Sequence, residues 1–128
     1  MKYLTWGDIE HLVDNLAKQL ENHGFNSIYG MPRGGLIPTV MISHRLGIPL
    51  IDKLGGLETS RYTLVIDDIC DTGETLKEIY WKTATLHYKP HSIYVPDFYA
   101  KEIPNNQWIN YPWEHEGALP IQDYKHNK

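Results

Sequence analysis

The chain has 128 residues, of which 41% are hydrophobic and 22% charged, and its formal net charge is −4. This length and composition are typical of one globular domain, and the lack of a basic excess argues against a protein that binds nucleic acid or an anionic membrane. Because Cys70 is the only cysteine and no apolar run is long enough to span a bilayer, we expect a soluble cytoplasmic protein without an internal disulfide.

The first half of the chain alternates helical and extended patterns. Residues 5–24 carry apolar side chains at helical spacing, with Thr5 as a suitable N-cap and Gly24 as a suitable stop. Residues 25–31 predict a strand, and residues 36–47 predict a helix with Pro38 in its first turn. A second strand is expected at 48–51. The apolar run at 62–67 is typical of a strand inside a parallel sheet.

The second half begins with the same alternation and then changes character. Residues 73–84 predict a helix and residues 84–89 a further strand. After Pro90, short extended pieces at 92–103 and 107–114 are rich in aromatic residues and proline. We therefore predict a single α/β domain over residues 1–128, with a mainly parallel central sheet flanked by helices. Its core would span about 5–90, and a smaller C-terminal segment about 91–116.

Three loops at the carboxyl ends of the predicted strands contain polar residues suited to ligand binding: MPRGGL at 31–36, DDICDTGET at 67–75 and KPHS at 89–92. The connection after residue 51 has no comparable set. Parallel sheets bind their ligands at the carboxyl ends of the strands. The three loops therefore mark one candidate site.

The second of these loops crowds four carboxylates into eight residues: Asp67, Asp68, Asp71 and Glu74. Thr72, Gly73 and Thr75 lead into the predicted helix, whose N-terminus would suit a phosphate. The adjacent pair Asp67 and Asp68 could accept hydrogen bonds from sugar hydroxyls or hold Mg²⁺. Solvated loop acids are the structural alternative. An acid pair that ends a buried strand favours a phosphorylated sugar with a metal.

The other candidates each have a structural alternative. Arg33 would supply charge to an anion and Gly34 a main-chain N–H, although the segment could be a plain turn. Lys89 could bind a ligand or reach solvent, and Trp108 could stack on a base or fill the core. His87 and His91 are four residues apart, but Lys89-Pro90 between them excludes a helix and argues against a zinc pair. The chain has no G-x-x-x-x-G-K-[ST] loop, which argues against a P-loop enzyme.

The segment LVIDDICDTGETL at 64–76 resembles the signature by which type I phosphoribosyltransferases bind 5-phosphoribosyl 1-pyrophosphate (PRPP). The segments TW, MPRGGLIP, LGI, KP and IPNNQWINYPWE are similar to segments of the bacterial xanthine-guanine branch of that family. They occur in the same order and cover most of Thr5 to Glu114.

The resemblance implies a role for each candidate residue. Asp67 and Asp68 would engage the ribose hydroxyls, with Mg²⁺ within reach. The cradle of the 5-phosphate would consist of Asp71, Thr72, Gly73 and Thr75. Asp71 would also exchange the proton of purine N7, and Arg33 and Gly34 would bind pyrophosphate through an unusual backbone conformation at Pro32–Arg33. Lys89 would donate to the 6-oxo group of the base, Trp108 would stack on the base, and the backbone of Ile109 would contact its edge. The C-terminal segment at about 91–116 would thus be a base-binding segment.

The activity implied is Mg²⁺-dependent transfer of the 5-phosphoribosyl group from PRPP to a 6-oxopurine: guanine, xanthine or hypoxanthine. The products would be GMP, XMP or IMP and pyrophosphate, and the enzyme would be a homo-oligomer. One departure is the connection at 52–63, which is shorter than the family's segment with its mobile lid. That departure leaves open a non-catalytic module that senses PRPP or purine nucleotides. A phosphoribosyltransferase for another base, such as uracil, is the third interpretation.

Overall fold

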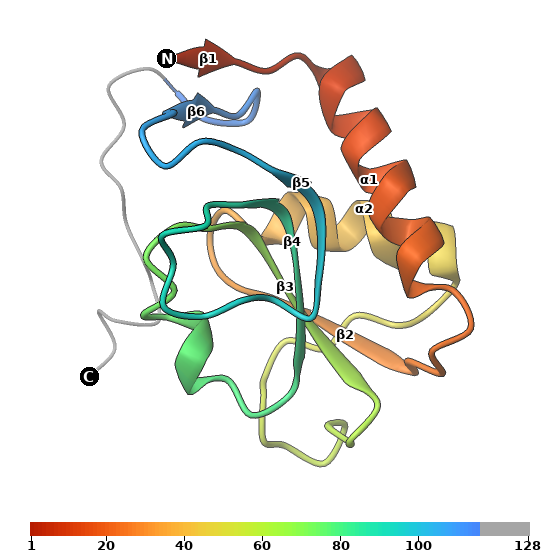
Figure 1. Cartoon of the computed structure of the whole chain (residues 1–128). Coiled ribbons are helices and arrows are strands. Elements are labelled where there is room, and N and C mark those ends of the chain that lie inside the picture. Colours follow the sequence, from red (N-terminus) through yellow and green to blue (C-terminus); the bar gives the residue numbers. More distant parts are fainter. Residues whose placement is uncertain (116–128) are drawn as a thin grey trace.

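The computed structural model describes residues 1–115. Its main sheet is parallel throughout and contains, in spatial order, β2 (Ser27–Gly30), β3 (Thr63–Cys70), β4 (Lys82–Tyr88) and β5 (Phe98–Glu102). A second, two-stranded sheet pairs β1 (Lys2–Tyr3) with β6 (Ile109–Asn110) near the N-terminus (Figure 1). The predicted α/β fold with a parallel sheet is confirmed. The boundary between core and base-binding segment stays a prediction, and residue 116 of that segment lies outside the described residues.

The two predicted helices of the first half are present. Helix α1 (Trp6–Leu20) begins with a capping box, in which the Asp8 amide donates to the Thr5 hydroxyl over 3.1 Å and the Thr5 amide donates to the Asp8 carboxylate over 2.8 Å. It ends at Leu20, before the predicted stop at Gly24. Helix α2 (Leu36–Leu46) ends as predicted at Gly47, whose φ of 68° is the left-handed conformation that glycine favours.

The sheet buries apolar side chains on both faces because β3 alternates between them. Leu64 and Ile66 pack with α1 and α2 in the larger core cluster, whereas Val65 belongs to a second cluster with Leu76 and Tyr88 on the opposite face. All three β3 side chains are completely buried. A strand enclosed on both sides explains the unbroken apolar run in the sequence.

The predicted helix at 73–84 is wrong. The structure has only a 3-10 turn, Leu76–Glu78, followed by extended backbone at Ile79, and β4 already begins at Lys82. Residues 71–81 must connect two parallel neighbours, which leaves room for little more than one helical turn. The apolar residues of this segment pack onto the sheet, Leu76 within the second cluster and Ile79 and Trp81 against it.

Other boundaries also differ from the prediction. The expected strand at 48–51 is reduced to a single bridge between Ile28 and Leu50, and β3 continues three residues past the predicted end, to Cys70. Strand β1 was not predicted, because two residues carry no periodicity. Neither helix among residues 1–115 is long and apolar enough to cross a membrane.

Candidate active site

The acid pair lies at the carboxyl end of β3, between β2 and β4. The Asp68 amide donates to Asp67 Oδ1 over 2.8 Å, and the Ile69 amide donates to Asp68 Oδ1 over 2.8 Å. Burial raises the pKa of Asp67 well above its usual value, and repulsion from Asp68 adds to the shift. Burial raises the pKa of Asp68 as well, although hydrogen bonds partly oppose it. Both carboxylates would therefore gain from a nearby cation.

The predicted pyrophosphate loop reaches this acid pair. The peptide bond between Pro32 and Arg33 is cis, which is the unusual backbone conformation expected there. Gly34 lies so close to Asp68 that an added β-carbon would stand 2.7 Å from Asp68 Cγ. The Gly35 amide donates to the Met31 carbonyl over 2.8 Å and closes the turn. The main chain at Gly34 and the carboxylate of Asp68 thus form one surface.

We expect Gly34→Ala to displace Asp68, because the new methyl group would overlap its carboxylate. Overpacking of this kind costs about 1–3 kcal/mol, and a displacement of roughly 1 Å lowers catalytic efficiency by about 100-fold. Steady-state kinetics with PRPP and thermal unfolding would measure both effects. Gly7→Ala on α1 is the control, since its nearest contact is an ordinary 3.6 Å to the Thr5 hydroxyl. Full activity of Gly34→Ala would show that this close approach has no functional importance.

Asp71 joins the loop after β3 to the loop after β4. Lys89 Nζ lies 3.1 Å from Asp71 Oδ2, and His91 Nε2 lies 2.6 Å from Asp71 Oδ1. The Lys89 side chain is only 6% exposed, the Asp71 side chain 39% and the His91 side chain 43%. Burial raises the pKa of Asp71, but the hydrogen bonds from His91 and Lys89 outweigh it and the pKa is lowered. The carboxylate is therefore ionised and held by a donor on each oxygen.

The loop predicted to cradle a phosphate is fastened by its neighbours rather than by a long helix. The Ile93 amide donates to the Thr72 carbonyl over 2.9 Å, and the Glu74 amide donates to the Thr72 hydroxyl over 3.3 Å. Gly73 has a φ of 83° and packs against Ser92. Thr75 starts the 3-10 turn. The turn residues are in place, but the full helix dipole that the sequence predicted is missing.

The two predicted base-binding residues of the C-terminal segment lie at β6: Ile109 is its first residue, and Trp108 directly precedes it. Trp108 is 58% exposed, so its indole is open to stacking rather than part of the core. Its carbonyl accepts from the Lys2 amide over 2.8 Å, and the Asn110 carbonyl accepts from the Leu4 amide over 3.0 Å. Alternate residues of a strand point their polar main-chain groups to opposite sides, so those of Ile109 face away from β1.

A buried polar contact fixes this segment to the core. His87 Nδ1 lies 2.8 Å from the Tyr111 hydroxyl, which donates to the Asp68 carbonyl over 3.3 Å. Burial lowers the pKa of His87 to about 4 and raises that of Tyr111 well above its usual value, so both groups are neutral. Sequence reasoning weighed His87 and His91 as a pair only for zinc and argued against that, and it assigned no role to Tyr111. In the structure the two histidines make different contacts, His87 with Tyr111 and His91 with Asp71.

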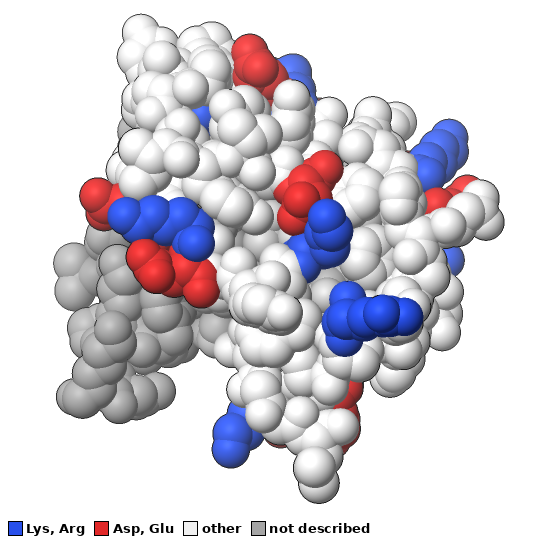
Figure 2. Space-filling view, turned by 60° about the horizontal axis from the view of Figure 1, so that its bottom comes forward, with Lys and Arg blue, Asp and Glu red and all other residues white. Residues whose placement is uncertain are grey.

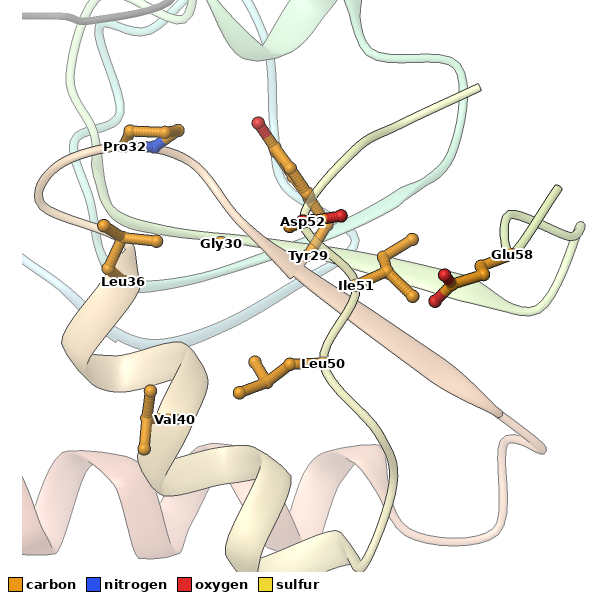
Figure 3. A pocket seen from close by; sticks show the side chains of 9 residues that line it. All are labelled: Tyr29, Gly30, Pro32, Leu36, Val40, Leu50, Ile51, Asp52 and Glu58. Carbon is orange, nitrogen blue, oxygen red and sulfur yellow. The ribbon is translucent and has the colours of Figure 1, made fainter. Parts of the chain in front are cut away.

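A cavity of about 500 Å³ lies beside the loop that is predicted to bind pyrophosphate, and none of the predicted site residues lines it. Figure 3 shows Leu36 and Val40 of α2 facing Leu50 and Ile51 across it. Tyr29, Gly30, Pro32, Asp52 and Glu58 complete its walls. Pro32 connects this cavity to the loop of Arg33 and Gly34. The short connection at 52–63 thus runs beside the candidate site rather than over the acid pair.

The described part of the chain has charged side chains of both signs on its surface but no ready-made cluster of metal ligands. On the face in Figure 2, small groups of basic and acidic residues lie interspersed among uncharged ones. Residues 1–115 contain no group of three or more histidine, cysteine or acidic side chains arranged to hold a metal. Two carboxylates suit Mg²⁺ when a bound phosphate supplies the remaining oxygens. The pair Asp67 and Asp68 therefore has the chemistry to hold Mg²⁺ only together with a bound phosphate.

Comparisons with known proteins agree on one class of enzyme. No family model matches the chain. A solved purine phosphoribosyltransferase from Pyrococcus horikoshii is 35% identical, with a TM-score of 0.76 and coverage of 94% of this chain and 96% of that one. The xanthine-guanine phosphoribosyltransferase of Chromohalobacter salexigens is 28% identical over 87% of this chain and 82% of its own. A xanthine-guanine-hypoxanthine phosphoribosyltransferase of Helicobacter pylori shares the fold, with a TM-score of 0.72 at 21% identity and coverage of 89% and 93%.

Proposed function

Because the chain belongs to the purine phosphoribosyltransferase family, we propose that it transfers the 5-phosphoribosyl group of PRPP to N9 of a 6-oxopurine and releases pyrophosphate. The observation that carries this proposal is the convergence of three loops: Gly34 lies against Asp68, and Asp71 binds Lys89. Each loop follows a different strand of one parallel sheet. Together they offer an anion loop, an acid pair and a group for proton transfer within one site.

PRPP would lie across the first two loops. Arg33 and the main chain at Gly34 would bind the pyrophosphate, while Asp67 and Asp68 would accept hydrogen bonds from the ribose hydroxyls. The turn of Asp71, Thr72, Gly73 and Thr75 would hold the 5-phosphate. Asp67 and Asp68, whose charges are disfavoured by burial, would hold Mg²⁺. When bound, this ion would supply positive charge to the leaving pyrophosphate. The acid pair also places negative charge near the cationic sugar that develops as pyrophosphate leaves.

The purine would lie between the loop after β4 and strand β6. Lys89 has three N–H donors, so it can bind Asp71 and still donate to the 6-oxo group of the base. Trp108 would stack on the ring, and the main chain of Ile109 would read its edge. Asp71 would take the proton of N7 as N9 attacks the sugar. Its ionised state in the structure is the one this role requires.

A substrate screen tests the proposal directly. Pyrophosphate release would be followed with PRPP and guanine, xanthine, hypoxanthine or uracil, with and without Mg²⁺. We expect turnover only with a 6-oxopurine and only with Mg²⁺ present. Turnover with uracil would assign a different base. Lys89 and Trp108, whose expected partners are a 6-oxo group and a purine ring, argue against that result.

The same screen separates an enzyme from a sensor. The short connection at 52–63 is the feature that favours a regulatory module, because it leaves little chain to close over PRPP and exclude water. Binding of GMP without turnover at high protein concentration would replace the enzyme proposal with that module. A homo-oligomeric state and a cytoplasmic location stay predictions, and sedimentation of the purified chain would measure the first.

A further inference from the structure

We propose that His91 is a positioning residue for Asp71, holding its carboxylate in the orientation that receives the purine proton. The proposal rests on the function proposed above, because it assigns a purpose to His91 within that reaction. The observation that carries it is the 2.6 Å contact between His91 Nε2 and Asp71 Oδ1. Because Asp71 is ionised, the proton of this contact sits on Nε2, and His91 is the donor.

The backbone places His91 beside Asp71. Its amide donates to Asn105 Oδ1 over 2.9 Å, which fixes the residue to the segment before β6. On either side, the Lys89 amide donates to the Cys70 carbonyl over 3.0 Å and the Ile93 amide donates to the Thr72 carbonyl over 2.9 Å. The last two bonds hold the loop after β4 against the end of β3 and the loop after it, and the first ties His91 to the segment before β6. The imidazole therefore starts from a fixed point next to the carboxylate.

Two donors on separate oxygens do more than one donor could. Lys89 approaches Oδ2 from the buried side, whereas the half-exposed His91 approaches Oδ1 from the solvent side. With Lys89 alone, the carboxylate could still rotate about its Cβ–Cγ bond. With both donors the plane of the carboxylate is fixed, and so is the direction in which a lone pair can point toward a base.

The contact also affects how readily Asp71 ionises. The groups that face Asp71 are Lys89 and His91 from the loop after β4 and the Cys70 thiol from the end of β3. Of these, His91 and Lys89 lower the pKa of Asp71, against the effect of burial. Removing His91 would leave Lys89 as the only side-chain donor to Asp71 among residues 1–115, so the pKa of Asp71 would rise.

Three variants test the proposal. In His91→Ala we expect kcat to fall by about 10- to 100-fold, the effect of losing a hydrogen bond to a charged group, while the KM for PRPP changes little. The acidic limb of the kcat/KM profile should move to higher pH, because Asp71 must be ionised to accept the proton. His91→Gln keeps an N–H donor of similar reach and should recover most of the rate. His11→Ala, an exposed histidine on α1, is the matched control and should behave as wild type.

Two results would overturn the proposal. One is an unchanged rate and pH profile in His91→Ala. The other is His91→Gln behaving like His91→Ala, since His91 would then act through its own titration and not through Asp71. An NMR titration that measures the pKa of the Asp71 carboxyl group in wild type and in His91→Ala tests the contact without requiring turnover. The wild-type protein could show no transferase activity while the pKa of Asp71 is still higher in His91→Ala than in wild type. That result would support the contact between His91 and Asp71 and reject only the proposed function.

Discussion

Replacing Asp71 with Asn is expected to lower the rate of nucleotide formation by about 10²- to 10⁴-fold, the usual effect of losing a general acid–base group. An amide of the same shape accepts no proton at neutral pH, so purine N7 would keep its proton while N9 attacks the sugar. The substitution leaves the surrounding main chain unchanged. The measurement is single-turnover formation of nucleotide, with enzyme in excess over the base and PRPP saturating, which reports chemistry rather than product release.

The same variant should also lose stability, because Lys89 is nearly buried and Asp71 is its only ion-pair partner among the described residues. Removing one member of such a pair leaves a charge without compensation. The double variant Asp71→Asn/Lys89→Met removes that charge too, so its melting temperature should recover while its activity stays low. Recovery of stability would show that the loss in Asp71→Asn comes from the unpaired Lys89 charge, and activity should stay low because both the proton acceptor and a predicted base contact are then missing. An Asp71→Asn variant with wild-type turnover would show that another group handles the proton.

The sequence predicted those parts of the fold that repeat a pattern over many residues. The helix from Trp6 to Leu20 has a capping residue and four turns of apolar spacing, and β3 has an unbroken apolar run. Such signals are local and need no knowledge of the partner element. Strands β1 and β6 have two residues each and exist only because they pair with one another. A two-residue segment has no sequence pattern from which that pairing could be predicted.

The failed helix at 73–84 has a tertiary cause. Its apolar residues cover the second face of the sheet, over a connection too short for a helix. The site shows the same limit. The acid pair and Asp71 stand out as a motif, but the contact of His91 with Asp71 depends on how the loops after β3 and β4 are bonded together. Residues that act in a site through tertiary contacts leave no local signal in a single sequence.

Asp67→Asn is the second substitution with a large expected effect, and it should act in opposite directions on activity and stability. Activity should fall by about 100-fold or more, the loss typical of removing one preorganised electrostatic contact. The melting temperature without Mg²⁺ should rise by a few degrees. Burial and the neighbouring Asp68 both disfavour a charge at Asp67, and the amide removes that charge. Asn can still accept the Asp68 amide hydrogen bond.

The expected gain in stability of Asp67→Asn follows from proton linkage. The folded chain has a raised pKa at Asp67, so it binds this proton more tightly than the unfolded chain does, and the ionised group reduces stability at neutral pH. That penalty shrinks as the pH falls through the raised pKa, so the advantage of Asp67→Asn should shrink with it. Asp14→Asn is the control, because the hydrogen bond from Arg45 lowers the pKa of Asp14 and its charge favours folding. If Asp67→Asn instead melted below wild type, the acid pair would have a structural purpose, and its assignment to sugar and metal would lose its physical basis.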